Sequence, residues 1–323
     1  MFNVALFVAA LLLTVLIGQL LLPKLIDLKV SQSIRSDGPQ RHLAKSGTPT
    51  MGGLLFIAAS ILCSIFLIDE QPLLWVWLFS YLSFGLIGFL DDFAKLRHQE
   101  NKGLSGKQKL FAQFVAVAIL LLLNQLLLDR GTSFGVFGTV WDAGWLYYPL
   151  TAIFIVGMVN AVNLTDGLDG LAAGVSFFCF AGFVLAGIPL AHIFPAYARM
   201  PQIAMIMCGC CLGFLFYNRY PARLFMGDTG SMALGGAIVG LAVTCRLELL
   251  LLGLGLVYLI EAASVMLQVA WFKLTQKRLF LMSPIHHHFE LQGWRETRVT
   301  SVFYLAAALC TLISVGLFRF LYQ

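Results

Sequence analysis

Charged residues are scarce in this sequence, which excludes an ordinary soluble domain. Of its 323 residues, 11% are charged and 59% are hydrophobic, whereas soluble domains carry about 25% charged residues. No stretch interleaves basic and aromatic residues in the way of a nucleic-acid surface, so we expect no nucleic-acid partner.

A cleavable leader and a cysteine-based site are missing as well. The first apolar segment has no basic region before it and no small-residue cleavage site, so we interpret it as a retained membrane span. All seven cysteines lie in or beside apolar segments. Cys208, Cys210 and Cys211 come closest to a metal motif, but the apolar surroundings and the lack of a second cluster favour helix packing.

Nucleotide-hydrolysis and nucleophile motifs are also lacking. The stretch Gly103–Lys109 resembles a phosphate-binding loop faintly, but its glycine spacing is wrong and Gln108 stands where Ser or Thr is needed. Lys107 and Lys109 remain candidate cations for a phosphate. We find no Ser or Cys nucleophile paired with a base.

Long apolar segments are what the sequence does contain, and they approach the ~20 residues of a membrane-spanning helix. We predict an all-α integral membrane protein, a single polytopic domain over residues 1–323. An even number of spans places both termini on one side. The ten predicted spans are 1–22, 51–68, 73–90, 110–128, 149–164, 170–191, 202–217, 231–244, 247–271 and 299–321.

Basic residues predict the orientation of these spans. The loops after odd-numbered spans hold 17 of the 21 Lys and Arg residues, so we place these loops in the cytoplasm and both termini in the periplasm. The outer loop Asp129–Tyr148 is rich in aromatics and is interpreted as an interfacial belt. No internal repeat is evident, which argues against an inverted-repeat transporter.

The first two cytoplasmic loops carry candidate binding residues. In the first, Lys45 offers a cation and Thr50 a hydroxyl, although the same residues suit a membrane anchor and a helix cap. In the second, Asp91, Asp92 and Lys95 follow an apolar span directly. Asp91 and Lys95 have the spacing of a helical ion pair. An acid here can accept a phosphate proton or hold a cation; the alternative is a solvated interfacial turn.

The third and fourth cytoplasmic loops are the acidic ones. Asn163, Asp166 and Asp169 are spaced by three residues and share one broad face if the segment is helical. Uncompensated acids beside apolar spans imply a cation or a hydrogen-bonding ligand, with helix capping as the alternative. Asp228 lies between Gly227 and Gly230. It is either a cap for the eighth span or a holder of Mg²⁺ against a phosphate.

The fifth cytoplasmic loop contains three consecutive histidines. Ser283 and Pro284 predict a helix start, with Ser as the N-cap and Pro at the first helical position. Consecutive histidines point in different directions around a helix, so we expect hydrogen bonds to phosphate or substrate rather than one shared metal; the residues are His286, His287 and His288. Glu261 is an isolated acid inside the ninth span, either functional or buried against a neighbouring helix.

These loops together favour phosphoryl transfer from a soluble pyrophosphate donor to a lipid-borne acceptor. Mg²⁺ would neutralise the pyrophosphate, and lysines would hold the acceptor phosphate.

Five motifs give the chain a family resemblance. The sequence resembles the bacterial phospho-N-acetylmuramoyl-pentapeptide transferases of the polyprenyl-phosphate N-acetylhexosamine-1-phosphate transferase superfamily, over essentially its whole length. The histidine run favours this family over its relatives. The motifs are KSGTPTMGG (45–53), DDFAK (91–95), NLTDGLDG (163–170), NRYPARLFMGDTGS (218–231) and SPIHHHFE (283–290).

The resemblance implies a reaction and its surroundings. Phospho-MurNAc-pentapeptide would pass from UDP-MurNAc-pentapeptide to undecaprenyl phosphate, with Mg²⁺, giving lipid I and UMP for peptidoglycan synthesis. The family fold implies ten helices, a homodimer and a cytoplasm-facing cleft in the bacterial inner membrane. Nucleoside-type inhibitors are expected to bind the uridine site.

The resemblance also implies residue roles. Asp228 would hold Mg²⁺, and Asp91 and Asp92 would serve the acceptor phosphate, with Asp91 as the base. The uridine pocket would be lined by Lys45, Leu168, Asp169 and Phe225. The pyrophosphate and sugar would be surrounded by Lys107, Asn163, Asp166, Asn218, His286, His287 and His288.

Two routes and two other functions stay open. The acceptor phosphate attacks directly, which we favour because a metal-engaged acid is a poor nucleophile, or Asp228 first forms a covalent intermediate. Within the superfamily, the alternative is a GlcNAc-1-phosphate transferase. Outside it, Glu261 and the polar groups near the membrane suggest an ion-coupled transporter.

Overall fold

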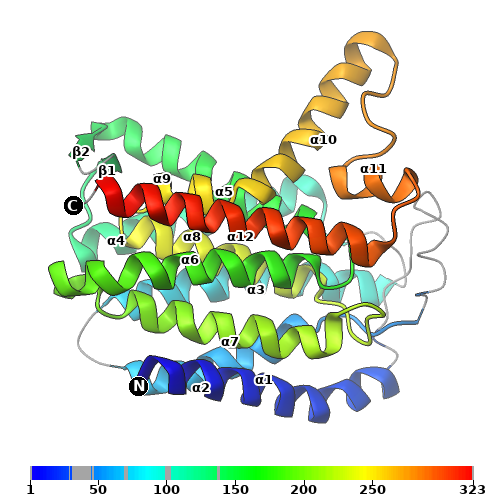
Figure 1. The fold of residues 1–323 in the computed structure, drawn as a ribbon, viewed down its shortest axis with the longest axis horizontal. Helices are drawn as coiled ribbons and strands as arrows, with labels where there is room; N and C mark the ends of the chain where they lie inside the picture. Colours follow the sequence, from blue (N-terminus) through cyan, green and yellow to red (C-terminus); the bar gives the residue numbers. More distant parts are fainter. Residues whose placement is uncertain are drawn as a thin grey trace.

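The computed structural model describes residues 2–28, 30, 45, 47–68, 72–98, 103–136 and 139–321. Most of the first predicted loop, including Ser46 of its motif, lies outside these residues. The long helices run side by side in one bundle (Figure 1). The elements are α1 Phe2–Asp27, α2 Gly53–Ser64, η2 Ile65–Leu67, α3 Leu73–His98, α4 Gly106–Leu128, β1 Ser133–Val136, β2 Thr139–Asp142, η3 Gly144–Leu146, α5 Tyr147–Thr165, α6 Leu171–Ile193, η4 Pro195–Tyr197, α7 Met200–Asn218, α8 Gly227–Thr244, α9 Glu248–Leu254, α10 Leu256–Thr275, α11 Ile285–Leu291 and α12 Glu296–Leu321.

Eight helices in the described part of the chain are long and apolar enough to cross a membrane, so the protein is a multi-pass membrane protein. The two other predicted spans fall on shorter or more enclosed helices. The range 51–68 forms the 12-residue α2 with the short η2, and the range 231–244 lies within α8. The total of ten crossings stays a prediction.

Helix α8 forms the centre of the bundle. Every residue from Thr229 to Thr244 is buried, and α8 packs against α2, α3 and α5. Its many glycines and alanines let neighbouring backbones approach, as is usual where helices pack inside a membrane. Polar side chains of α3 use this proximity: Ser80 Oγ donates to the carbonyl of Gly236 at 2.7 Å, and Trp77 Nε1 donates to that of Ala237 at 3.0 Å.

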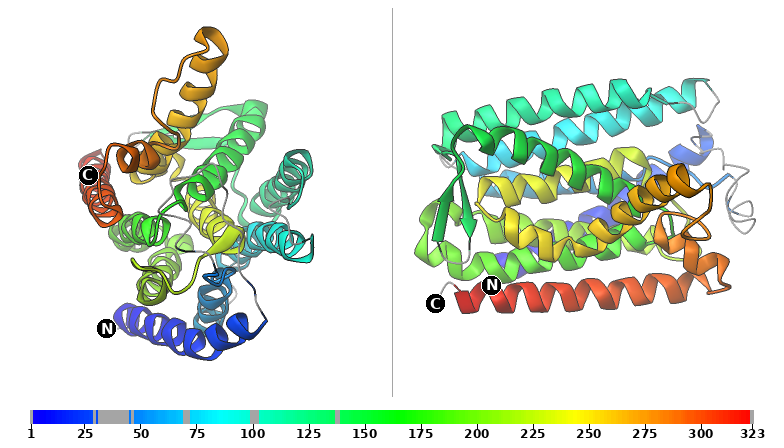
Figure 2. Two further views of the ribbon diagram at one scale, coloured as in Figure 1. Left: turned by 90° about the vertical axis from the view of Figure 1, so that its right-hand side faces the viewer. Right: turned by 90° about the horizontal axis from the view of Figure 1, so that it is seen from above.

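The predicted ninth span, 247–271, is two helices rather than one. Helix α9 ends at Leu254, Gly255 interrupts the pattern, and α10 begins at Leu256. From there α10 projects away from the bundle (Figures 1 and 2). Its outer part exposes large apolar side chains such as Met266, Leu267 and Leu274, which suits contact with lipid.

The predicted interfacial belt, 129–148, contains a feature that the all-α prediction missed. Strands β1 and β2 form an antiparallel hairpin, in which Phe134 pairs with Trp141. Trp141 and Trp145 are exposed, as a belt requires, but Tyr147 is buried in the core. Its hydroxyl lies 3.4 Å from Glu248, which Arg130 binds at 2.6 Å. Tyr147 therefore belongs to a buried ion-pair cluster.

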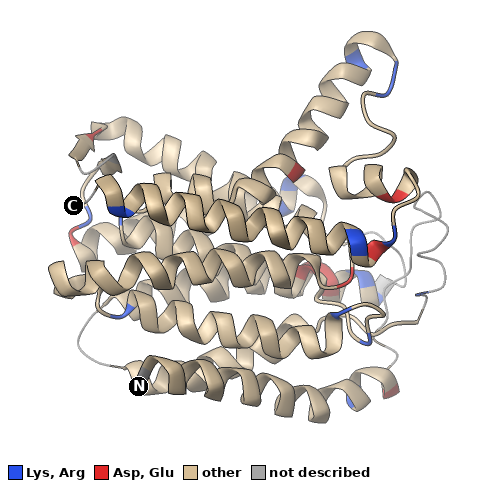
Figure 3. Ribbon diagram, in the orientation of Figure 1, with Lys and Arg blue, Asp and Glu red and all other residues tan. Residues whose placement is uncertain are grey.

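Charged residues gather at one end of the bundle. Helices α1, α3, α5 and α7 end there and α11 lies there, while α1 begins and α12 ends at the opposite end (Figures 1 and 3). The predicted grouping of the polar loops is thus confirmed. The side of the membrane that they face stays a prediction.

A glycine in α3 sets the distance between this helix and the start of α8. A Cβ at Gly88 would overlap the carbonyl oxygen of Asp228, and added atoms in a packed interior cost about 1–3 kcal/mol. We predict that Gly88→Ala lowers the melting temperature in detergent by several degrees. Gly316→Ala is the matched control, because no atom lies within 4 Å of its added methyl. Equal melting temperatures would contradict this account of α3–α8 packing.

Candidate active site

Two groups of charged side chains occupy the polar end of the bundle. The first, the acid–lysine cluster, consists of Asp91, Asp92, Lys95, Lys109 and Asp228. The second, the Lys45 cluster, consists of Lys45, Asp169 and Glu296. The turn 166–170, which follows α5, contributes Asp169 to the second cluster.

Asp92 caps the first turn of α8 from a neighbouring helix. Its Oδ1 accepts from the backbone N–H of Asp228 at 3.2 Å, and its Oδ2 accepts from the backbone N–H and hydroxyl of Thr229 at 2.8 and 2.7 Å. The first N–H groups of a helix have no partner within the helix, and a carboxylate is favoured there by the helix dipole. Met226 at the N-cap supplies no side-chain bond. The predicted capping role belongs to Asp92 rather than to Asp228.

Asp91 is held by its own helix and by the next loop. Its Oδ2 lies 2.6 Å from Lys95 Nζ, which confirms the predicted pair at i,i+4. Its Oδ1 accepts from the backbone N–H of Leu104 at 2.9 Å, and Gly103 lies directly against the carboxylate. The loop before α4 therefore covers this acid, which is buried.

Asp228 receives the two lysines. Its Oδ2 lies 2.9 Å from Lys95 Nζ and 2.9 Å from Lys109 Nζ. Its Oδ1 accepts from Asn163 Nδ2 at 2.9 Å, and Asn163 also donates to Ser231 Oγ at 2.7 Å. Three helices, α3, α4 and α5, thus reach one carboxylate in the first turn of α8.

The acid–lysine cluster has the donor set of a divalent cation site. One carboxylate oxygen from each of Asp91, Asp92 and Asp228 lies within 4.8 Å of the others. Among the residues that the structure describes, this is the only group of three or more potential metal ligands. Oxygen ligands are those that Mg²⁺ prefers, and three acids against two lysines leave an excess of negative charge. The residues therefore fit a hard divalent cation.

The Lys45 cluster borders a cavity of about 670 Å³. Lys45 Nζ lies 2.7 Å from Asp169 Oδ1 and 2.7 Å from Glu296 Oε1. Burial lowers the pKa of Lys45, but its bonds to these two acids outweigh burial and raise it above the usual value. The cavity is lined by Lys45, Thr48, Asp169, Tyr220, Pro221, Ala222, Glu290, Arg295, Glu296 and Thr297.

Acids of both clusters affect the pKa of Asp166. Burial and the nearby charges of Asp228, Asp92 and Asp169 raise its pKa to about 8. At neutral pH and without a bound cation it is therefore mostly a neutral acid. The neighbouring segment is a turn, since α5 ends at Thr165. The shared face of Asn163, Asp166 and Asp169 was expected only for a helical segment, so this condition is not met. Asn163 reaches Asp228, and Asp169 reaches Lys45.

Several other predicted residues support the site from within the protein. Asn218 accepts from the N–H of Gly170 at 3.0 Å and donates to the carbonyl of Leu224 at 2.9 Å, so it ties the turn to the stretch before α8. The hydroxyl of Thr50 is buried, has no hydrogen-bond partner among the residues that the structure describes, and lies beside Gly227. Leu168 is part of the hydrophobic core.

Phe225 and Lys107 occupy more open positions. Phe225 is partly buried, and its backbone pairs with Pro49 and Gly52 at 2.8 Å each. Lys107 is exposed on the first turn of α4. Their predicted contacts with substrate, like that of Leu168, stay predictions.

The three histidines fan around α11 as predicted, but they meet different surroundings. His286 is fully buried, with Nδ1 3.0 Å from Glu261 Oε2. His287 Nδ1 lies 2.8 Å from Glu290 Oε2, and His288 Nδ1 accepts from the N–H of Leu281 at 3.1 Å.

The predicted helix start was wrong in detail. Pro284 occupies the N-cap rather than the first helical position, and no side chain caps α11. Ile285 and Phe289 pack against the hydrophobic core.

Sequence reasoning missed three residues of the site and left one choice open. Of the two candidate phosphate cations on α4, Lys109 rather than Lys107 reaches Asp228, a choice that helical phase within α4 decides. Glu296 lies between Arg295 and Arg298 in the sequence, a pattern that is typical of a surface ion pair. Ser231 and Tyr220 lie within the motif at 218–231. Ser231 is identified only by the hydrogen bond that it accepts from Asn163, and Tyr220 only by the position of Lys45 over its ring.

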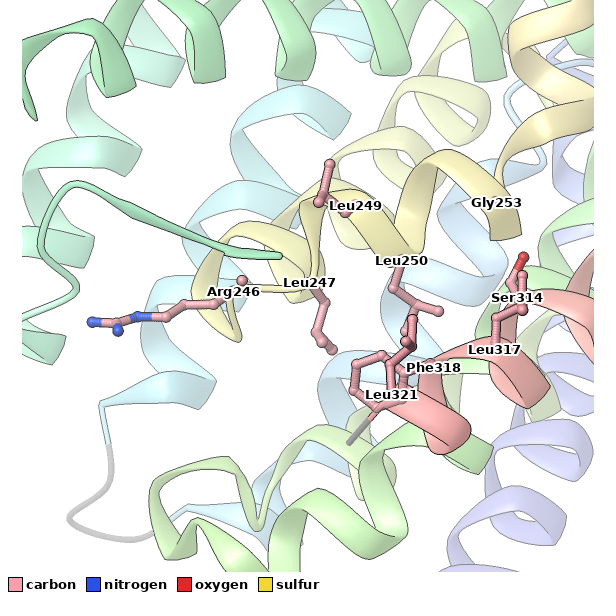
Figure 4. Close-up of a pocket in the computed structure, with 10 residues that line it drawn as sticks. Arg246, Leu247, Leu249, Leu250, Gly253, Ser314, Leu317, Phe318 and Leu321 are labelled. Atoms are coloured by element: carbon pink, nitrogen blue, oxygen red, sulfur yellow. The ribbon is translucent and has the colours of Figure 1, made fainter. Parts of the chain in front are cut away.

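A second cavity, of about 170 Å³, lies between α9 and α12 at the other end of the bundle. Leucines and Phe318 dominate its wall, and Arg246 extends away from it (Figure 4). So apolar a lining does not suit phosphate or metal chemistry, which leaves the polar end as the candidate functional site.

The cap on α8 gives a first prediction for this site. Asp92→Ala removes the acceptor for two backbone N–H groups, and loss of a helix cap costs about 0.5–2 kcal/mol. Asp92→Asn keeps one acceptor oxygen, so it should melt between the wild type and Asp92→Ala in detergent. Asp129→Asn, an exposed acid at the other end of the bundle, is the control and should melt like the wild type. Indistinguishable melting of all four proteins would refute the cap.

The acid Asp166 gives a prediction about pH. Its pKa is about 8 in the folded protein against an ordinary 3.8, so the folded chain holds more protons between these values and loses stability as the pH rises through them. Asp166→Asn removes this loss. Without divalent cations, the variant should gain melting temperature relative to the wild type from about pH 4 to pH 8, with no further gain above. A constant difference across this range would contradict the assignment.

Comparisons with known proteins agree with this geometry. The model of the Glycosyl transferase family 4 matches residues 74–246, which include both acids of α3, the turn after α5 and Asp228. A signature of phospho-N-acetylmuramoyl-pentapeptide-transferases matches residues 45–57, which include Lys45 and Thr50.

Individual relatives extend the match over nearly the whole chain. The phospho-N-acetylmuramoyl-pentapeptide-transferase of Heliobacterium modesticaldum is 48% identical, covering 96% of this chain and 95% of its own length. Those of Desulfitobacterium hafniense and Thermoanaerobacter sp. are 47% and 44% identical over 95% of this chain, and over 94% and 96% of their own lengths. With its eight apolar helices and its clustered acids and lysines, the chain belongs to the phospho-N-acetylmuramoyl-pentapeptide-transferase family and is a membrane-embedded transferase.

Proposed function

We propose that the enzyme transfers phospho-MurNAc-pentapeptide from UDP-MurNAc-pentapeptide to undecaprenyl phosphate, giving lipid I and UMP. The observation that carries the proposal is the placement of the acid–lysine cluster and the Lys45 cluster at one end of a membrane bundle. A lipid phosphate and a soluble nucleotide can meet only where polar groups border the membrane. The full-length similarity to named transferases supports the same reaction.

Mg²⁺ is the cofactor that the donor set favours. Asp228, with Asp91 and Asp92 beside it, would hold the cation. When bound, Mg²⁺ supplies positive charge that neutralises the pyrophosphate and its developing negative charge.

The acceptor phosphate is assigned to the α3 side of the cluster. Lys95 and Lys109 supply cations within reach of the acceptor phosphate. If that phosphate arrives as the monoanion, Asp91 is the base that takes its remaining proton. Asp92 acts through α8, because both of its oxygens are engaged by the first turn of that helix. Lys107, exposed on the same turn of α4 as Lys109, is proposed to meet the phosphates as they enter.

The donor nucleotide is assigned to the Lys45 cluster. Its cavity offers an aromatic ring at Tyr220, an ammonium at Lys45 and carboxylates at Asp169 and Glu296, which suit the faces and polar edges of uracil. Phe225 and Leu168 are the other proposed uridine contacts. Nucleoside-type inhibitors should compete at this cavity.

The sugar and pyrophosphate are assigned to the space between the clusters. Asn163 and Asp166 come from the end of α5, and Asn218 ties the turn that follows Asp166 to the stretch before α8. Within the described ranges the hydroxyl of Thr50 has no hydrogen-bond partner, so it can donate to a substrate oxygen. His287 and His288 are partly exposed and are the proposed imidazole contacts.

Direct attack by the acceptor phosphate is the proposed route. Asp228 already accepts from Lys95, Lys109 and Asn163, so its lone pairs are committed to cations and hydrogen bonds. A nucleophile so engaged is weak. A single displacement in which Asp91 receives the acceptor proton avoids this difficulty.

The setting of the enzyme follows from the charge distribution. The basic loops favour a cytoplasm-facing site in the bacterial inner membrane, where the nucleotide donor is found. The chain is proposed to be a single polytopic domain that works as a homodimer.

The proposal predicts metal-dependent release of UMP. With both substrates, the wild type should release UMP only when Mg²⁺ is present, and Asp228→Asn should lower the rate by about 100- to 1,000-fold. The measurement is UMP formation by purified enzyme in detergent. Labelled donor without acceptor lipid should leave no label on the protein.

The control is Asp129→Asn, which changes an exposed acid at the far end of the bundle and should keep full activity. Full activity of Asp228→Asn would refute the metal assignment. Stable label on Asp228 would replace direct attack by the covalent route, and turnover of UDP-GlcNAc alone would change the substrate.

A further inference from the structure

Glu261 and His286 form an isolated buried pair beside the candidate site. Both side chains are fully buried, and His286 Nδ1 lies 3.0 Å from Glu261 Oε2. Glu261 lies near the start of α10, and His286 lies on α11, after the chain has travelled outward and returned. A buried carboxyl group needs a partner. Helix α11 supplies this partner to Glu261 through His286.

The free nitrogen of His286 faces the turn after α5. Its Nε2 has no hydrogen-bond partner in the described part of the chain, yet it lies directly against Gly167. Glu261 is therefore the only polar partner shown for this ring, since the other contact, with the ring of His287, is aromatic. The ring's orientation depends on Glu261.

Gly167 is a glycine for a steric reason. Its φ is not among the positive values of the chain, so its backbone conformation would accept another residue. A Cβ at this position would overlap the imidazole of His286. The contact thus joins α10, α11 and the turn that carries Asp166 and Asp169.

We propose that Glu261 is a positioning residue for the transferase site. It holds His286 with the proton on Nδ1 and the lone pair on Nε2, and so presses the imidazole against Gly167. The ring fixes the turn 166–170, and with it Asp166 and Asp169. His286 then acts through this turn, and not by touching substrate as the sequence had suggested.

This inference rests on the proposed function for its kinetic consequence only. A carboxylate that orients a histidine fixes its tautomer and ring angle, and loss of such a partner typically costs about 10- to 100-fold in activity. The turn carries Asp166, which is assigned to the pyrophosphate whose bond breaks, and Asp169 of the donor-nucleotide site, so the loss should appear in kcat and also in KM for the donor.

The first test measures the tautomer of His286 directly. Protein labelled with ¹⁵N at its six histidines is studied by NMR in detergent, and His286→Ala identifies the signal. The wild type should show protonated Nδ1 and bare Nε2 at His286. Glu261→Gln, which can donate or accept at the same place, should lose this preference. An Nε2-protonated ring in the wild type would overturn the proposal, whatever the substrate of the enzyme.

The second test uses UMP release and double mutants. Glu261→Gln should lower kcat by about 10- to 100-fold, and it should also raise KM for the donor, because the displaced turn carries Asp169. Gly167→Ala should show the same pattern because its methyl displaces the ring. Groups that act as one unit are not additive, so neither change should lower kcat further in a His286→Ala background. Additive losses, or wild-type kcat in Glu261→Gln, would overturn the positioning role.

Glu248→Gln is the matched control. Glu248 is also a buried acid, but it pairs with Arg130 at the other end of the bundle. This variant should lower the melting temperature while keeping kcat per folded enzyme and the His286 tautomer. A wild type that releases no UMP would reject the proposed function, and the NMR result would still decide the role of Glu261.

Discussion

The bond between Asp92 and the start of α8 is the contact on which the site depends. Helix α8 is enclosed by protein, so its first N–H groups cannot turn to water. Asp92 satisfies those of Asp228 and Thr229 from the end of α3, and it can reach them because Gly88 lets the two backbones meet. The same contact fixes the position of Asp228 in the first turn of α8. It therefore also fixes the point at which Lys95 and Lys109 converge.

Pairing of opposite charges is the second constraint, because an apolar bundle tolerates few unpaired ions. Lys95 and Lys109 share Asp228, and Lys45 is shared by Asp169 and Glu296. At the far end, Arg130 and Glu248 form a similar buried pair. The chain's few charges therefore build its chemistry at one end and its packing at the other. Asp166 is the exception, and its raised pKa is the result of having acids for neighbours.

Local spacing in the sequence predicted what lies within one helix or motif. The apolar segments, the Asp91–Lys95 pair and the gathering of polar loops at one end all follow from periodicity and charge. Contacts between distant segments could not be predicted this way. Nothing in the spacing indicates that Asp92 caps α8, that Glu296 completes the Lys45 cluster, or that Gly255 divides the ninth span. The conformation of the turn after α5 stayed open, because a three-residue spacing fits a helix and a turn equally well.

The two lysines on Asp228 act as counterions that the protein carries itself. A divalent cation held by this carboxylate would repel both ammonium groups, so the cation and the lysines would compete for Asp228. Lys95 and Lys109, displaced from Asp228, would be free to pair with a phosphate. Binding of the cation and of a phosphate would then be coupled, and the ionic strength of the medium would affect both together.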